Sequence, residues 1–251
     1  MKFIGIIPAR YASSRFPGKP LAMIGKQTMI ERVYRRAQLA LDEVAVATDD
    51  ERILHAVESF GGRAIMTSPL HRSGTDRCHE AYTLSGSDAD VVINIQGDEP
   101  FIDPSQIEAL KGCFADSDCE IATLVRRFNP DDGFETLSNP NTPKVVLGGD
   151  GSALYFSRSV IPYVRGSETQ EWANAAKYYT HVGLYGYRAD VLAKLVALPQ
   201  SSLELAESLE QLRWLQTGFR IKTAVTDCPT IGIDTPEDLQ RALAHIRDLG
   251  E

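Results

Sequence analysis

The sequence predicts an α/β fold in which a mostly parallel sheet carries helices on both faces. Two observations support this fold class. Short apolar runs, each long enough for one buried strand, alternate with amphipathic helical patterns through the first half of the 251-residue chain. No internal repeat or long linker interrupts the sequence, so we expect one domain over residues 1–251, with a smaller mixed β excursion near residues 126–190.

The first half is expected to supply the parallel core. The run 3–8 is almost continuously apolar, as in a strand that is buried on both faces. Between Thr28 and Ala40, apolar residues recur at helical spacing, which predicts an amphipathic helix. The further expected elements are strands at 43–48, 63–66 and 91–95, a helix opened by Asp49-Asp50 and closed by Gly61-Gly62, and a helix from Asp103-Pro104 to about Phe114.

The second half departs from this alternation. The segment Gly148-Gly149-Asp150-Gly151 separates two β-rich runs, at 144–147 and 153–157, which is typical of a hairpin. The polar segment 167–176 is predicted to be a mobile loop. The remaining expected elements are a strand at 181–187, helices near 189–196 and 203–216, and a last helix that begins at Thr235-Pro236-Glu237-Asp238.

Composition excludes several classes of protein. The net charge is −8 and the isoelectric point is about 5.2, so binding to nucleic acid by charge alone is disfavoured. No apolar stretch is long enough to cross a bilayer and no targeting segment is visible, so we expect a cytoplasmic protein without a membrane partner. The four cysteines form no CxxC pair, which favours reduced thiols over a zinc site or disulfides.

A basic segment directly follows the first expected strand. It places Arg10, Arg15 and Lys19 within ten positions, with small residues between them. Ligands of open α/β sheets bind beyond the carboxyl ends of the strands, and small residues let backbone N–H groups approach an anion. The segment therefore suits a triphosphate, although it is neither a GxxxxGK[ST] loop nor a GxGxxG turn. A solvated surface loop is the alternative.

Two carboxylates also follow expected strands. Asp98 lies in the segment Asn94–Pro100, just after the run 91–95, and Asp234 precedes the last helix. Mg²⁺ prefers hard oxygen ligands and keeps substrate phosphates in its coordination shell. Two strand-end carboxylates beside a triphosphate loop therefore indicate a Mg²⁺ site. The alternatives are an ordinary Asp-Gly turn at position 98 and an ordinary helix start at position 234.

Eight segments, in this order, resemble the family of 3-deoxy-manno-octulosonate cytidylyltransferases, also called CMP-Kdo synthetases. The resemblance spans nearly the whole chain. It departs from the pattern of other members only like for like, with Ser-Arg-Phe at 14–16 and Thr-Asp-Arg at 75–77. The matching segments are 7–21 (IPARYASSRFPGKPL), 47–50 (ATDD), 71–77 (HRSGTDR), 94–100 (NIQGDEP), 153–158 (ALYFSR), 181–188 (HVGLYGYR), 209–213 (LEQLR) and 232–238 (GIDTPED).

The resemblance implies a GT-A-like nucleotidyltransferase fold and a homodimer, with the excursion used for sugar binding and dimerisation. It implies the reaction CTP + 3-deoxy-D-manno-octulosonate (Kdo) → CMP-Kdo + diphosphate, which activates Kdo for lipopolysaccharide synthesis, with Mg²⁺ as cofactor. The implied catalytic residues are Lys19, Asp98, Asp234 and Arg15, of which Asp98 and Asp234 hold the metal. The implied nucleotide-binding residues are Ala9, Arg10, Ser13, Arg15, Lys19, Thr48, Asp49, Arg72, Ser73, Gly74 and Gln96. The implied sugar-binding residues are Gln96, Arg158, His181, Tyr185, Glu210 and Gln211.

Alternatives stay open at this point. A sister enzyme that activates 8-amino-Kdo or a sialic acid fits the same motifs. A GT-A glycosyltransferase would call for a D-x-D metal motif, and a non-catalytic CTP-binding module would not need two carboxylates. Arg158 also suits a surface charge and His181 a core position. Leu154, Phe156 and Leu184 in the excursion fit a dimer interface and a core equally well.

Overall fold

The computed structural model describes residues 1–12 and 15–249, with residues 245–249 described as helix backbone only. Contacts divide the chain into two compact units. The first comprises residues 1–108, 186–196 and 229–251, and the second comprises residues 109–185 and 197–228. Most of the expected excursion lies in the second unit, which takes in more of the chain than the excursion does. No described helix has the length and apolar character that crossing a membrane requires.

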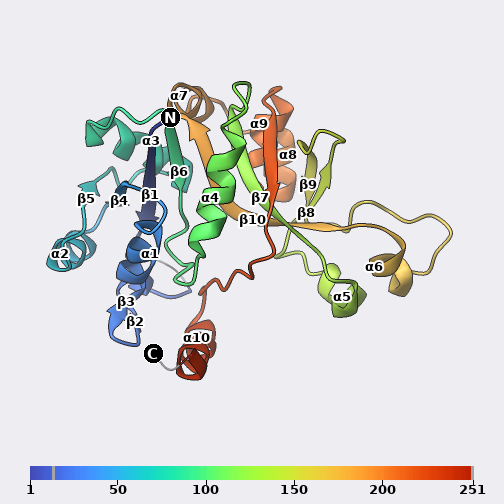
Figure 1. Cartoon of the computed structure of the whole chain (residues 1–251), viewed down its shortest axis with the longest axis horizontal. Helices are drawn as coiled ribbons and strands as arrows, with labels where there is room; N and C mark the ends of the chain where they lie inside the picture. Colours follow the sequence, from blue (N-terminus) through green and yellow to red (C-terminus); the bar gives the residue numbers. More distant parts are fainter. Residues whose placement is uncertain (13–14, 250–251) are drawn as a thin grey trace. The chain divides into compact units, whose positions relative to one another are not determined.

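The first unit is built on parallel strands in the order β6-β1-β4-β5 (Figure 1). The centre of β1 is fully buried, with Ile4, Ile6 and Ile7 at 0% exposure, as the continuous apolar run predicts. This part of the fold class is confirmed. The strands are β1 (Phe3–Ala9), β4 (Glu43–Thr48), β5 (Ala64–Met66) and β6 (Val91–Asn94), with a small separate pair β2 (Met23–Ile24) and β3 (Gln27–Thr28).

Helices cover both faces of these strands. The chain steps from β1 to β4 to β5 in one direction and then returns across the sheet to β6. Because such crossovers are right-handed, the helices of the first two steps lie on one face and that of the return lies on the other. The helices of this unit are η1 (Lys19–Leu21), α1 (Met29–Ala37), α2 (Glu51–Ser59), α3 (Gly74–Ser85), α7 (Ala189–Val196) and α10 (Pro236–Leu249), while α4 (Pro104–Cys113) belongs to both units.

Most helix starts follow their sequence signals. The hydroxyl of Thr28 accepts a hydrogen bond from Glu31 N at the start of α1, and the carboxylate of Asp50 accepts one from Arg52 N at the start of α2. Helix α3 is not among the expected elements. Its buried face includes Thr75 and Arg77, so the apolar periodicity that marks an amphipathic helix is weak there.

The second unit contains a mixed set of strands. Strand β11 runs parallel to β7, which neighbours β10, and β8 runs antiparallel to both β9 and β10. The hairpin of β8 and β9 has the predicted bounds. The elements are β7 (Ile121–Arg127), η2 (Pro130–Asp132), α5 (Gly133–Leu137), β8 (Lys144–Leu147), β9 (Ala153–Ser157), η3 (Thr169–Glu171), α6 (Trp172–Ala175), β10 (Tyr179–Arg188, ending in the first unit), α8 (Ser202–Glu207), α9 (Gln211–Gln216) and β11 (Ile221–Val225).

Two expectations are wrong in this unit. The segment 167–176 is not a loop throughout, because it forms η3 and α6 and buries Trp172 against Phe134 and Tyr178. The single helix expected at 203–216 is two helices, α8 and α9. The chain leaves α8 at Ser208, whose φ of 50° is left-handed, and α9 begins three residues later.

Candidate active site

A cavity of about 300 Å³ opens at the carboxyl ends of β1 and β6 in the first unit. This is where open α/β sheets bind ligands. Three segments form its wall: the end of β1 with the basic segment, the N-terminus of α3, and the turn after β6. The lining residues are Pro8, Ala9, Arg10, Ala12, Lys19, Pro20, Arg72, Ser73, Gly74, Arg77, Gln96, Gly97 and Asp98.

Gly97 brings the end of β6 against the end of β1. A Cβ atom at this position would lie 2.8 Å from the carbonyl oxygen of Pro8, which is closer than a real side chain allows. Two residues earlier on each strand, Ile95 N donates to Ile6 O at 2.9 Å. The glycine therefore lets the two strand ends touch and sets Gln96 and Asp98 into the cavity wall.

The two predicted carboxylates converge on one lysine. Lys19 Nζ donates to Asp98 Oδ2 at 2.8 Å and to Asp234 Oδ1 at 3.1 Å. Arg15 Nη1 lies 3.2 Å from Asp234 Oδ2. The backbones are also joined, since Ile233 N donates to Asp98 O at 2.9 Å. Residues far apart in sequence thus form one charged cluster, in which Asp98 follows β6, as predicted, and Asp234 follows a segment without strand structure.

This cluster influences its neighbour Glu99. Burial has the largest effect on the pKa of the Glu99 carboxyl, and the negative charge of Asp98 has the second largest. Together they raise this pKa to about 7.

The turn that carries Asp234 is held by Asp238, whose Oδ2 accepts from Asp234 N at 3.0 Å and from Thr235 N at 2.9 Å. A carboxylate that accepts two backbone hydrogen bonds fixes the turn that carries Asp234.

The donor set fits Mg²⁺ only together with substrate oxygens. Asp98 and Asp234 already share one cation, the ammonium of Lys19. No group of three or more His, Cys, Asp or Glu side chains that could hold a metal ion occurs among the described residues. Mg²⁺ is commonly held by one or two carboxylates plus phosphates and water. Two converging carboxylates beside a cavity meet that requirement.

The N-terminus of α3 forms a second wall of the cavity. Ser73 and Asp76 make a capping box, in which Asp76 N donates to Ser73 Oγ at 3.1 Å and Ser73 N donates to Asp76 Oδ2 at 3.3 Å. Arg72, Ser73 and Gly74 line the cavity. The first turn of a helix of 12 residues favours negative charge nearby, which suits phosphate groups.

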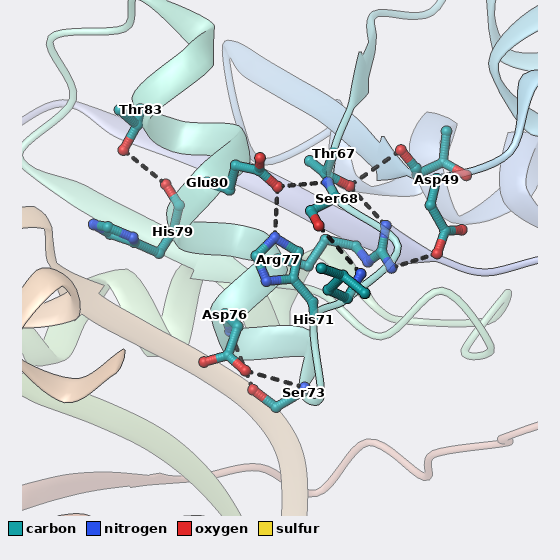
Figure 2. A network of polar contacts seen from close by, with 12 residues as sticks. Asp49, Thr67, Ser68, His71, Ser73, Asp76, Arg77, His79, Glu80 and Thr83 are labelled. Atoms are coloured by element: carbon teal, nitrogen blue, oxygen red, sulfur yellow. Dashed lines mark hydrogen bonds and ion pairs between the residues drawn. The ribbon is translucent and has the colours of Figure 1, made fainter. Parts of the chain in front are cut away.

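A polar network ties α3 to the strand ends (Figure 2). Arg77, with no exposed side-chain surface, donates from Nη2 to Asp49 Oδ2 at 2.8 Å and from Nη1 to Thr67 Oγ1 at 2.6 Å. Thr48 is buried, and its Oγ1 accepts from Asp50 N at 3.2 Å. Thr48 and Asp49 do not line the cavity, so their predicted place beside the cytosine and ribose stays a prediction. Ser13 lies outside the described residues.

In the second unit, His181 and Tyr185 lie in an aromatic cluster. The His181 ring centroid is 5.2 Å from those of Phe156 and Tyr185, and Tyr185 meets Trp214 edge-on at 5.2 Å. His181 Nε2 lies 3.1 Å from Thr123 Oγ1. Burial lowers the pKa of His181 to about 4, so the ring is neutral at pH 7 and offers hydrogen bonds rather than charge.

Gln211 is a polar residue with an unmet hydrogen-bond requirement. Its side chain is 5% exposed, and its Nε2 has no hydrogen-bond partner among the described residues. It begins α9 directly after Glu210, whose Oε1 lies 3.6 Å from Arg213 Nη2. Buried amide donors are normally satisfied, so a ligand or water is expected there.

Arg158 is engaged by the backbone. Its guanidinium donates from Nε to Glu207 O at 2.6 Å, from Nη1 to Pro140 O at 2.8 Å and from Nη2 to Ser208 O at 3.1 Å. These bonds fix the break between α8 and α9. A role of Arg158 toward a sugar carboxylate stays a prediction.

Sequence reasoning missed four residues that shape the first-unit site. Three of them lie inside segments that carry the family resemblance, but no site role was assigned to them there, and Glu80 lies outside those segments. Two of them, Arg77 and Glu80, are three residues apart on α3, so a prediction of this helix would have placed them on one face. The four are Arg77, Glu80, Glu99 and Asp238.

Comparison with known proteins bears on both units. A model of the family described as cytidylyltransferase matches residues 4–222. The chain is 62% identical to the 3-deoxy-manno-octulosonate cytidylyltransferase of Phocaeicola vulgatus over 98% of both chains, and 60% identical to that of Bacteroides thetaiotaomicron over 99% of both.

Solved structures give the same picture. A CMP:2-keto-3-deoxy-manno-octonic acid synthetase complexed with CTP superposes with a TM-score of 0.90 at 45% identity, over 99% of this chain and 100% of the other. A glucose-1-phosphate thymidylyltransferase from Bacillus anthracis shares the fold alone, with a TM-score of 0.65 at 18% identity over 98% and 96%. The α/β nucleotidyltransferase fold is therefore confirmed, and the chain belongs to the cytidylyltransferase family.

Proposed function

We propose that this protein transfers a cytidylyl group from CTP to 3-deoxy-D-manno-octulosonate, giving CMP-Kdo and diphosphate. The observation that carries the proposal is the convergence of Asp98 and Asp234 on Lys19, beside a cavity lined by further cations. A triphosphate needs positive charge around it, and a reacting phosphate needs a metal held by hard oxygens. Relatives at 60–62% identity that carry the name of this activity support the choice of substrates.

The chemical step is an in-line displacement. The anomeric hydroxyl on C2 of Kdo attacks the α-phosphorus of CTP, so a C–O–P bond forms, the bond from that phosphorus to the bridging oxygen breaks, and diphosphate leaves. The hydroxyl proton is lost to water. Kdo carries a carboxylate on the same carbon, so two anions meet, and neutralising their charge is the main catalytic task. Arg10, Arg15 and Lys19 are the cations of the first unit that we assign to the triphosphate.

We assign Mg²⁺ to Asp98 and Asp234, with the nucleotide phosphates completing its coordination. When bound, Mg²⁺ supplies positive charge to the reacting phosphate and lowers the pKa of a coordinated hydroxyl. Lys19 contacts both of these carboxylates, so it lies next to the proposed metal. Arg15, whose side chain is 65% exposed, is available to a leaving diphosphate.

We assign the sugar acid to polar groups of the second unit and to Gln96. The neutral ring of His181 and the buried amide of Gln211 suit the hydroxyl groups of a sugar better than they suit a phosphate. Tyr185, Glu210 and Arg158 complete the proposed set.

We further propose that the enzyme acts in the cytoplasm as a homodimer and without nucleic acid. Of the apolar residues considered for the interface, Phe156 and Leu184 lie in the core at 0% and 1% exposure. Leu154 on β9 is 61% exposed, and the interface that we propose includes it. Light scattering at micromolar protein should give the mass of two chains, and Leu154→Glu should shift it toward one.

One assay separates the proposed function from its rivals. Diphosphate release from CTP is measured with Kdo, 8-amino-Kdo and N-acetylneuraminate offered separately, with Mg²⁺ present. Release that is fastest with Kdo is expected. Preference for another acid would make the protein a sister cytidylyltransferase. Binding of CTP without release, for every acid, would indicate a binding module. Transfer of Kdo from CMP-Kdo to an acceptor, with CMP released, would indicate a glycosyltransferase.

A further inference from the structure

The segment 67–73 connects β5 to α3 and supplies part of the cavity wall. Arg72 and Ser73 at its end line the cavity. The segment has no regular structure until the cap at Ser73, so its shape depends on side-chain contacts. Figure 2 shows that these contacts come from one face of α3, from Arg77 and Glu80.

Glu80 holds the segment at two points with a single carboxylate oxygen. Its Oε2 accepts from Ser68 N at 2.7 Å and contacts Nε2 of His71. The Glu80 side chain is 33% exposed and that of His71 is 20% exposed, so water competes only partly for this contact. The His71 hydrogen bond, and then the bond from Ser68 N, lower the pKa of Glu80, which therefore stays ionised near neutral pH.

His71 reaches the nucleotide side of the cavity through its backbone. Its carbonyl oxygen accepts a hydrogen bond from Nη2 of Arg10, which follows β1. Arg10 lines the cavity. The direction of the Arg10 guanidinium thus depends on the position of the His71 carbonyl. The position of that carbonyl depends in turn on the His71 ring, which Glu80 holds.

Arg77 anchors the other end of the same segment. Its guanidinium donates to Thr67 and to Asp49, and Asp49 is the residue that directly follows β4. Arg77 therefore fixes the segment to the sheet, and this leaves Glu80 to set the position of His71. Because Arg77 holds α3 to the strands and Glu80 holds His71, loss of Glu80 should move Arg10 while α3 stays attached to the strands.

We propose that Glu80 is a positioning residue for the nucleotide, which acts through His71 on Arg10. The proposal rests on the proposed function in one respect, namely that Arg10 binds the phosphates of CTP. Glu80 itself does not line the cavity. A role of this kind predicts coupling between Glu80 and Arg10, whereas a purely structural role of Glu80 predicts independent effects.

The test is a double-mutant cycle on CTP binding, measured by calorimetry with the full-length protein and Mg²⁺. Glu80→Ala is expected to weaken CTP about tenfold, which corresponds to the loss of one charge-assisted contact. Arg10→Ala should weaken it by at least as much. In the double variant the loss should equal that of Arg10→Ala alone, because Glu80 acts only through that side chain. Glu80→Gln keeps a carbonyl oxygen for Ser68 N and should bind CTP within about threefold of wild type.

Controls separate positioning from loss of stability. Glu58→Ala removes the exposed His55–Glu58 pair on α2, a matched Glu–His contact away from the cavity, and should leave CTP binding unchanged. If Glu80→Ala does not fold, His71→Ala replaces it in the cycle, since it removes the same ring contact and keeps the carbonyl. Losses that add in the double variant, or wild-type affinity in Glu80→Ala, would overturn the proposal. A wild-type protein that does not bind CTP would overturn the proposed function as well.

Discussion

Arg15 in the first unit and Arg158 in the second unit have different kinds of partner. In the first unit Arg15 and Lys19 converge on carboxylates at the strand ends, and the cations stand beside an open cavity. In the second unit the guanidinium of Arg158 donates to three backbone carbonyls, and the proposed sugar contacts include the neutral groups of His181 and Gln211. The first arrangement is suited to a polyanion and the second to a polyhydroxylated molecule. Residue type alone therefore does not reveal which charges meet a ligand.

The largest effect is expected from removing the carboxylates of Asp98 and Asp234, on which the proposed metal site of the first unit depends. Asp98→Ala and Asp234→Ala should each lower kcat on the order of a hundredfold or more, because each loses a metal ligand. Steady-state diphosphate release at saturating Mg²⁺ measures this. Asp88→Ala, which removes only the exposed pair with Lys2, is the matched control and should keep full activity. Near-normal kcat in either site variant would remove that residue from the metal site.

The cations of the first unit can be tested by comparing nucleotides. Lys19→Ala and Arg15→Ala should weaken CTP by more than about tenfold and weaken CMP much less, because the outer phosphates carry most of the charge that these residues meet. Calorimetry with both nucleotides gives the ratio. An equal loss of affinity for CTP and CMP would show that the segment serves another purpose.

Arg158 tests the second unit. An ammonium group cannot reach three carbonyls that a planar guanidinium spans, so Arg158→Lys should lower the free energy of unfolding by roughly 2 kcal/mol. If Arg158 also meets the sugar carboxylate, the KM for Kdo rises about tenfold and that for CTP stays unchanged. Denaturant titration and kinetics are both needed. A rise in the KM for CTP alone would assign Arg158 to the nucleotide.

The last prediction concerns pH, and the expected effect at mildly acidic pH is on stability and not on the chemistry. The folded protein holds His181 at a pKa of about 4, whereas an unfolded histidine titrates near 6.5. Between these values the unfolded chain binds the extra proton, so stability is full above pH 6.5 and falls toward pH 4, by at most roughly 3 kcal/mol. In His181→Asn this contribution should be missing. Urea titrations from pH 4.5 to 7 give the two slopes, and equal slopes would contradict the assignment.

Much of the fold could be predicted from local pattern. The run of β1 is continuously apolar because both faces of the strand are buried, and the β8–β9 hairpin follows from its glycines. Strand β11 escaped prediction because only Ile221 in it is buried, which leaves no clear alternation. Helix α3 escaped because its buried face carries Arg77, a residue that normally marks a solvated face.

The candidate site divides in the same way. The closeness of Lys19 and Asp98 could be predicted because the basic segment and Asp98 follow neighbouring parallel strands, which share one carboxyl edge. Among the described residues no strand leads directly to Asp234, so its contact with Lys19 is predicted from residue type and from the family resemblance. The capped start Thr235–Asp238 also could be predicted from its motif. The contacts of Glu80 could not, because one of its partners is the backbone N–H of Ser68, whose position is set only in the folded chain. For the same reason the sequence did not reveal that backbone carbonyls occupy Arg158.

Gly97 has a consequence for how this sequence can vary over evolutionary time. Any side chain there would collide with the carbonyl oxygen of Pro8, an atom of the backbone that cannot rotate away. An alanine would have to separate two paired strands, and the cavity wall would move with them. No substitution of Gly97 is therefore expected to be neutral. Lineages that keep this cavity are expected to keep the glycine, even where the residues that contact the substrate have changed with a new substrate.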